Sequence, residues 1–346
     1  MSQMLLHCTT LDSRLQYEIC VQKGKNRRRL FPKDVMIYNI TFKEMIVIFI
    51  SDYLGVKTKG HQNYEFVDAF LNGDNQLFID PCMIEGAEDP WSKNAANIMR
   101  VFFDCLFKGL REKTLYTSGL LSHAGEQNAT KLGYGNGYNG KGKTAEGLWD
   151  CISGLSLLVH DIPTISRAQD IPVLVEGFAE DCMSDLLTNI LHEPLNTFTC
   201  EQMSAWGCAA QGEKAIWTFD IATKEWIQVV RPCWYYKGKE LLLVPKWIVR
   251  KNFLFKAHQY LYSVIVERIR KANGWDDLKK VDIWSNLPRI SEHWEYDTVI
   301  AYTREHPETL SEYHDHMPRF YRRARGCMTD ADLDIVVYGR RTQESA

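Results

Sequence analysis

Acidic residues in the middle of the chain have the types and spacing of a metal-dependent hydrolase site. Glu176 follows the apolar run 173–175, and Asp181 and Asp185 lie four residues apart in a segment with helical periodicity. Residues at this spacing share one face of a helix. Magnesium-dependent cleavage of phosphodiesters requires two or three carboxylates that converge on the metal. We therefore predict that Glu176, Asp181 and Asp185 bind Mg²⁺ or Mn²⁺ and act in catalysis.

A lysine at the end of an apolar run would complete such a site. Lys246 closes the run Leu-Leu-Leu-Val-Pro, and we predict that it steadies the attacking water or the scissile phosphate. The PD-(D/E)xK nuclease signature is absent, because Glu240 and Lys246 stand six residues apart. The alternative for the acids is a helix N-terminus, where they only interact favourably with the helix dipole.

A glycine-rich loop could bind phosphate. Gly137–Thr144 matches the P-loop string G-x-x-x-x-G-K-[S/T] letter for letter. In this interpretation Lys141, Gly142, Lys143 and Thr144 bind phosphate, through backbone N–H groups, the lysines and a magnesium ion held by the threonine. The preceding residues are polar and contain no buried strand, as a true P-loop would require. A glycine-rich surface loop that contacts phosphate is the alternative.

Two basic segments and an uneven distribution of charge permit a nucleic-acid partner. Residues 23–33 carry six positive charges and no acid, and residues 319–325 read Arg-Phe-Tyr-Arg-Arg-Ala-Arg. Interleaved aromatic and guanidinium groups suit stacking on bases and contact with phosphate; the alternative is an exposed helix with solvated arginines. The net charge is −3, but residues 170–226 hold ten acids and two bases, whereas residues 227–280 hold twelve bases and four acids.

Helices and strands alternate in the segments that would position these residues. Periodicity of apolar residues predicts helices at 90–110, 145–159, 183–191 with Pro194 as its end, and 247–271. Short apolar runs and turn signals predict strands at 76–80, 171–176 and 240–246, and a hairpin at 215–220 and 226–230. We expect an α+β or mixed α/β fold, with a central mixed sheet flanked by helices and a largely helical C-terminal part. The expected division is 1–75, 76–250 and 251–346.

Composition excludes several classes of protein. The 346 residues are 45% hydrophobic and 25% charged, with 22 Gly and 11 Pro, which excludes collagen, a coiled coil and long disorder. The start lacks the features of a signal peptide, and the longest apolar run, 45–50, is too short to cross a bilayer. Ten dispersed cysteines include no Cys-x-x-Cys pair, so we expect reduced thiols in a cytoplasmic protein without a membrane partner.

Three segments of the chain resemble sequences in other proteins. Residues 126–144, with Glu-Gln-Asn and Leu-Gly-Tyr-Gly, residues 180–191 and the run Leu-Leu-Leu-Val-Pro-Lys resemble a loosely defined set of uncharacterised bacterial proteins, associated with phage-defence and restriction-type gene neighbourhoods. The resemblance covers about the middle third of the chain and transfers no activity. It implies a nucleic-acid-directed effector, and it singles out Glu126 together with Asp181 and Asp185.

Three functions follow from these patterns. The first is a metal-dependent nuclease or related nucleic-acid-directed effector in antiviral defence, with Glu126, Glu176, Asp181, Asp185 and Lys246 as catalytic residues. The second is a nucleotide-binding or NTP-hydrolysing protein that uses the glycine loop. The third is a non-catalytic sensor or assembly subunit that binds nucleic acid, a protein partner or further copies of itself through its basic segments.

Overall fold

The computed structural model describes residues 4–11, 14–21, 48–114, 116–126, 128–134, 145–323 and 326–339. The chain forms two compact units, Met1–Ile46 and Val47–Ala346. In the first unit, β1 (Met4–Leu11) pairs antiparallel with β2 (Arg14–Val21). The basic segment 23–33 lies outside the described residues. The division of the chain near residues 75 and 250 stays a prediction.

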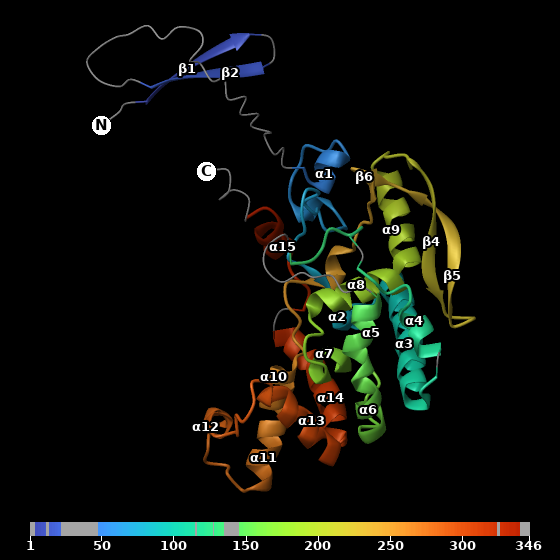
Figure 1. Cartoon of the computed structure of the whole chain (residues 1–346), viewed down its shortest axis with the longest axis vertical. Coiled ribbons are helices and arrows are strands. Elements are labelled where there is room, and N and C mark those ends of the chain that lie inside the picture. The colour runs from blue at the N-terminus through green and yellow to red at the C-terminus, as the bar shows by residue number, and fades with distance from the viewer. Residues whose placement is uncertain are drawn as a thin grey trace. The chain divides into compact units, whose positions relative to one another are not determined.

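The second unit is mainly helical (Figure 1). Its helices before the long hairpin are α1 (Ile50–Tyr53), the 3-10 turn η1 (His61–Asn63), α2 (Pro81–Gly86), α3 (Pro90–Glu112), α4 (Tyr116–Leu121), α5 (Ala145–Ser153), α6 (Leu155–Asp161), α7 (Asp170–Leu174), α8 (Glu180–Ile190) and α9 (His192–Ala205). After the hairpin come the 3-10 turn η2 (Lys246–Ile248), α10 (Ala257–Tyr260), the π-helical turn η3 (Leu261–Ile265), α11 (Val266–Ala272), α12 (Lys280–Ser285), α13 (Trp294–Glu305), α14 (Glu308–Arg323) and α15 (Asp330–Val337). The predicted helical C-terminal part is confirmed.

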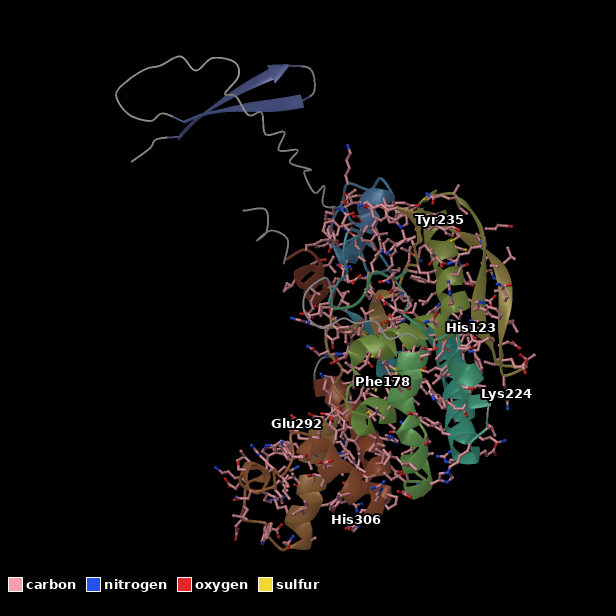
Figure 2. The ribbon with its side chains drawn as sticks, in the orientation of Figure 1. His123, Phe178, Lys224, Tyr235, Glu292 and His306 are labelled. Carbon is pink, nitrogen blue, oxygen red and sulfur yellow. The ribbon has the colours of Figure 1, made fainter. Side chains whose placement is uncertain are left out.

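Strands in the described residues pair only two by two. Besides β1 with β2, the pairs are β3 (Phe78–Ile79) with β8 (Val249–Arg250), β4 (Gly212–Asp220) with β5 (Glu225–Cys233), and β6 (Tyr235–Tyr236) with β7 (Lys239–Glu240), all antiparallel. The α+β class is confirmed, with four small sheets among the described residues where we expected one central mixed sheet. The predicted hairpin is confirmed as β4–β5, and Lys224 lies at its tip (Figure 2).

Local sequence signals define the longest helix. The Asp89 carboxylate caps α3 by accepting a hydrogen bond from the Ser92 N–H, and Pro90 occupies the first turn, where a missing N–H costs nothing. Lys113 ends the helix in a left-handed conformation, with φ 50°. The helix buries Ile98, Phe102 and other residues at helical spacing. The predicted helix 90–110 is thus confirmed.

Several predicted elements take another form. The run 171–176 is not a strand but the helix α7 and its following turn; the Asp170 carboxylate closes the turn before this helix by accepting hydrogen bonds from the N–H groups of Ser166 and Arg167. Pro194 lies in the first turn of α9, a position that proline tolerates, rather than at a helix end. The predicted helix 145–159 is divided at Gly154 into α5 and α6.

Two further predictions concern the segment after the hairpin. In the run 240–246 only Glu240 is in a strand, and residues 241–244 are buried without extending a sheet. The predicted helix 247–271 begins instead at Ala257 and contains one π-helical turn. Within the described residues, no helix has both the length and the apolar character that a membrane span requires.

Candidate functional site

Helix α14 is held at two points by buried carboxylates. His314 Nε2 lies 2.5 Å from Asp170 Oδ1, and both side chains are buried. Seven residues later, the Tyr321 hydroxyl donates a hydrogen bond to Asp80 Oδ2 at 2.6 Å. Both carboxylates belong to segments far away in the sequence. The two contacts therefore fix the rotation of α14 about its axis, and with it the direction of the residues on its other face.

That other face lines a cavity of about 700 Å³. From α14 the lining residues are His316, Arg319 and Phe320, and the rest of the wall comes from segment 253–263 and Lys280. No aspartate or glutamate is among the described residues that line it. The predicted basic and aromatic tail 319–325 thus contributes its first two residues to a cavity wall.

Three cations line this larger cavity, namely Lys256, Lys280 and Arg319. Lys280 Nζ lies 3.1 Å from Glu267 Oε2. The hydrogen bond from Arg270 and, to a lesser extent, the one from Lys280 lower the pKa of Glu267 to about 2, so the carboxylate that pairs with Lys280 stays ionised. Arg319 is exposed, and within the described part of the chain it has no ion-pair partner. Its guanidinium group is available to an incoming anion.

Aromatic rings stand beside these cations. Phe253, Tyr262 and Phe320 line the larger cavity together with His258 and His316. Tyr262 belongs to the π-helical turn η3, an irregularity that is frequent at functional sites. Rings and cations in one wall suit a ligand that has both flat faces and negative charge.

A second cavity, of about 180 Å³, shares Phe253 and Lys256 with the first. Phe178, in the turn between α7 and α8 (Figure 2), is buried and lines it. Glu180 is its only acidic residue among the described lining residues. The smaller cavity therefore joins apolar walls to one carboxylate.

Glu180 is held by two donors. Lys256 Nζ lies 2.5 Å from Glu180 Oε1, and the Tyr134 hydroxyl donates to Oε2 at 2.7 Å. Burial alone would raise the pKa of Glu180, but the contacts with Lys256 and Tyr134 outweigh it and lower the pKa below its usual value. The same contact and burial raise the pKa of Tyr134. Glu180 is thus an ionised acceptor in a largely buried position.

Two of the predicted catalytic acids lie close to each other. Burial and then the charges of Asp74 and Glu126 raise the pKa of Asp181 to about 6. Gly133, with φ +147°, passes so close that a Cβ atom there would lie 3.1 Å from Asp181 Oδ1. Asp74 was not singled out from the sequence. The signal that was present is the stretch 72–75, whose residue types are typical of a turn. Contact between segments 72–75, 126–133 and α8 creates this acidic cluster.

The other predicted acids lie elsewhere. Glu176 Oε2 is 2.5 Å from His293 Nδ1, before α13, and this contact raises the pKa of His293. Asp185 follows Asp181 by one turn of α8. No group of three or more His, Cys, Asp or Glu among the described residues could hold a metal ion. Among the described residues, Glu176 pairs with His293, whereas Asp181 and Asp74 both lie beside Gly133; the metal centre at Glu176, Asp181 and Asp185 stays a prediction.

Lys246 pairs with an acid of another helix and is not among the described residues that line the two cavities. Its Nζ atom lies 3.0 Å from Asp330 Oδ1 and donates to the His61 carbonyl oxygen at 3.0 Å. These contacts join η2 to η1 and to the start of α15. The structure thus places Lys246 in a connection between helices, and its role beside the predicted acids stays a prediction. The predicted phosphate-binding residues Lys141, Gly142, Lys143 and Thr144 lie outside the described residues.

Sequence patterns predict only some of the residues that line the two cavities. Lys256 and Lys280 belong to the basic block 227–280, and Arg319 and Phe320 belong to the tail. Phe253, Tyr262 and His316 carry no signal of their own, because aromatic residues and histidines are common in helices and loops. The joint location of these residues depends on the packing of α14 against segment 253–263.

Comparison with known proteins assigns the chain to a family. Residues 55–256 match the family model described as Domain of unknown function (DUF8370). The chain belongs to the DUF8370 family. This confirms the expected membership of a family without an established activity. Comparisons with curated proteins and with solved structures give no match.

The boundary of the DUF8370 match passes through the larger cavity. Phe253 and Lys256 lie inside the matched residues, whereas Tyr262, Lys280 and α14 lie beyond them. The smaller cavity lies within the DUF8370 match except for Tyr296. The larger cavity is therefore formed where the DUF8370 segment meets the C-terminal helices.

Proposed function

We propose that the protein is a nucleic-acid-directed effector that binds a single strand of DNA or RNA in the larger cavity. The observation that carries this proposal is the wall of that cavity, which combines Lys256, Lys280 and Arg319 with aromatic rings and has no carboxylate among its described lining residues. Proteins bind single strands with this pairing of cations for phosphates and rings for bases.

The cations account for the expected affinity. Phosphate oxygens accept charge-assisted hydrogen bonds, and a guanidinium group such as that of Arg319 can donate two in parallel. Each phosphate neutralised releases bound counterions, so binding must weaken as salt is added. The anchoring of α14 by Asp170 and Asp80 supports the proposal, because it holds Arg319 in place before a ligand arrives.

The rings account for the preference for a single strand. Stacking of a base on an aromatic side chain contributes about 1 to 3 kcal/mol, and every base has such a face. In a duplex these faces are covered by neighbouring bases. A volume of about 700 Å³ is in the usual range of pockets for small ligands, so it suits part of an unstacked strand.

Fluorescence anisotropy with labelled oligonucleotides of about 12 nucleotides tests the proposal. We expect single strands to bind more tightly than duplexes of the same sequence, with affinity that falls between about 50 and 200 mM salt. Arg319→Ala and Phe320→Ala should each weaken binding, by about fivefold or more. Arg100→Ala, at an exposed arginine of α3, is the matched control and should bind as the wild type does. Absence of binding at low salt would overturn the proposal.

We also propose that the protein cleaves the bound strand in a metal-dependent reaction. It is supported by the proximity of Glu126 and Asp181, two of the predicted catalytic acids, at the start of α8. Incubation of labelled DNA and RNA with Mg²⁺ or Mn²⁺ tests it, and Asp181→Asn should abolish any turnover. If the strands stay intact, the third predicted function remains, namely a non-catalytic sensor or assembly subunit.

The glycine loop and the cellular location are tested separately. Titration of ATP and GTP against the wild type and Lys143→Ala decides whether the P-loop string binds nucleotide. A cytoplasmic location is part of the proposal, and the dispersal of ten cysteines through a large chain without a Cys-x-x-Cys pair supports it. Fractionation of the producing cells checks that location.

A further inference from the structure

We propose that the smaller cavity is a subsite for one unstacked nucleobase that carries an exocyclic amino group. This inference rests on the proposed function, because the base would belong to the strand bound in the larger cavity. The cavity, its single carboxylate and its connection to the larger cavity carry the argument.

The walls of the smaller cavity suit a flat aromatic ligand. Phe178, Phe253 and Phe255 are buried and line it, and Tyr296 adds a fourth ring. The rings of Phe253 and Phe255 are stacked, with centroids 4.8 Å apart and an interplanar angle of 18°. Apolar walls of this kind contact the faces of a base, and the transfer of these faces out of water is favourable. A volume of about 180 Å³ restricts the ligand to a single small group.

The polar group in this cavity selects the edge of the base. Glu180 is 7% exposed, and when ionised it can only accept hydrogen bonds. Each carboxylate oxygen has two acceptor positions; the Tyr134 hydroxyl takes one on Oε2, whereas Oε1 is a buried atom that pairs with the Lys256 ammonium group as an ion pair and accepts no hydrogen bond among the described residues. The remaining positions are matched to an amino group. Thymine and uracil have no amino group, and their one ring N–H on this edge lies between two carbonyl acceptors that the carboxylate would repel, so these bases are disfavoured.

Shared residues connect the base subsite to the phosphate-binding cations. Phe253 and Lys256 line both cavities. The ammonium group of Lys256 contacts Glu180 in the smaller cavity and stands beside the wall that holds Arg319 in the larger one. A nucleotide of the strand can thus place its phosphate among the cations and turn its base into the smaller cavity.

Competition between two homopolymers tests this inference on the full chain. Strands of deoxycytidine and of deoxyuridine, each of about 12 nucleotides, have the same backbone and ring size. They differ in the amino or carbonyl group at the edge that Glu180 would contact. We expect the wild type to bind the deoxycytidine strand about tenfold more tightly, the effect typical of one well-placed base contact.

Variants of the cavity separate selection from folding. Glu180→Ala removes the acceptor and should lose the preference, whereas Glu180→Gln keeps one acceptor oxygen and should retain part of it. Ala179→Leu fills the cavity from an exposed position that tolerates a larger side chain, and it should also lose the preference. Glu176→Ala removes a neighbouring carboxylate that pairs with His293 instead, and it should keep the full preference.

The outcomes distinguish the inference from the function on which it rests. Equal, salt-dependent affinity of the wild type for both strands overturns the base subsite and leaves the proposed function intact. A preference that survives both Glu180→Ala and Ala179→Leu also overturns the subsite. Failure of the wild type to bind either strand overturns both proposals.

Discussion

His314 Nε2 lies 2.5 Å from Asp170 Oδ1, and this contact joins α14 to the start of α7 in the interior of the second unit. Asp170 also accepts hydrogen bonds from the N–H groups of Ser166 and Arg167. One carboxylate thus closes the turn before α7 and holds α14. The residues of α14 that line the larger cavity depend on it for their position.

Loss of this carboxylate should destabilise the fold strongly. Asp170→Ala leaves the buried His314 and two partly buried backbone N–H groups without their acceptor, so we expect a loss of about 3 to 5 kcal/mol in the free energy of unfolding. Urea denaturation measures it. Asp161→Ala is the control, because Asp161 pairs with Arg304 at an exposed site and should cost under about 1 kcal/mol. Similar small losses in both variants would contradict the structural role of Asp170.

Asp80 should make stability depend on pH. Burial, the largest effect, raises the pKa of Asp80 from 3.8 to about 7, while the hydrogen bond from Tyr321 opposes this shift. The folded state therefore keeps the proton over a pH range in which the unfolded state releases it. The contribution of Asp80 to stability is fully present below about pH 4 and is lost as pH rises to about 7.

Denaturation of Asp80→Asn across that pH range checks this prediction. Asparagine does not titrate, so the variant should lose this component of the pH dependence while other groups contribute as in the wild type. Tyr321→Phe removes the hydrogen bond that stabilises the ionised form and should move the midpoint of the dependence to higher pH. A dependence identical in the wild type and Asp80→Asn would argue that another group titrates.

Gly133 should not tolerate a side chain. Its φ of +147° is rarely adopted by other residues, and a Cβ atom would lie 3.1 Å from Asp181 Oδ1. We expect Gly133→Ala to lower stability by about 1 kcal/mol or more. Gly119→Ala is the matched control, since Gly119 lies in α4 with nothing within 4 Å of its added Cβ. Thermal unfolding should show that the control is neutral or slightly stabilised.

Lys246 should act on α15 rather than on catalysis. Lys246→Ala removes the contact with Asp330 and the hydrogen bond to the His61 carbonyl oxygen. We expect faster hydrogen exchange or proteolysis in α15, with unchanged affinity for oligonucleotides. Asp334→Ala, which breaks the 2.6 Å contact with His61 Nδ1, should have the same effect. Loss of oligonucleotide binding in Lys246→Ala alone would restore the role that the sequence predicted.

Signals within a few residues of one another were sufficient for part of the fold. The apolar period predicts α3, and two apolar runs around a turn predict β4–β5. These predictions succeed because a helix or hairpin satisfies its backbone hydrogen bonds locally. The prediction for 171–176 is wrong because an apolar run fits either a strand or a buried helix, and periodicity alone does not distinguish them.

The sequence by itself determined the mixture of helices and short strands, the helical C-terminal part and the presence of acidic and basic blocks. Only the tertiary structure decided which charges meet. Asp181 interacts with Asp74 as well as with the expected Glu126, and Lys246 pairs with Asp330 instead of one of the predicted catalytic acids. The cavities likewise combine residues from segment 253–263 with α8 or α14. Such contacts depend on the packing of segments far apart in the chain. The spacing of residues within one segment does not predict that packing.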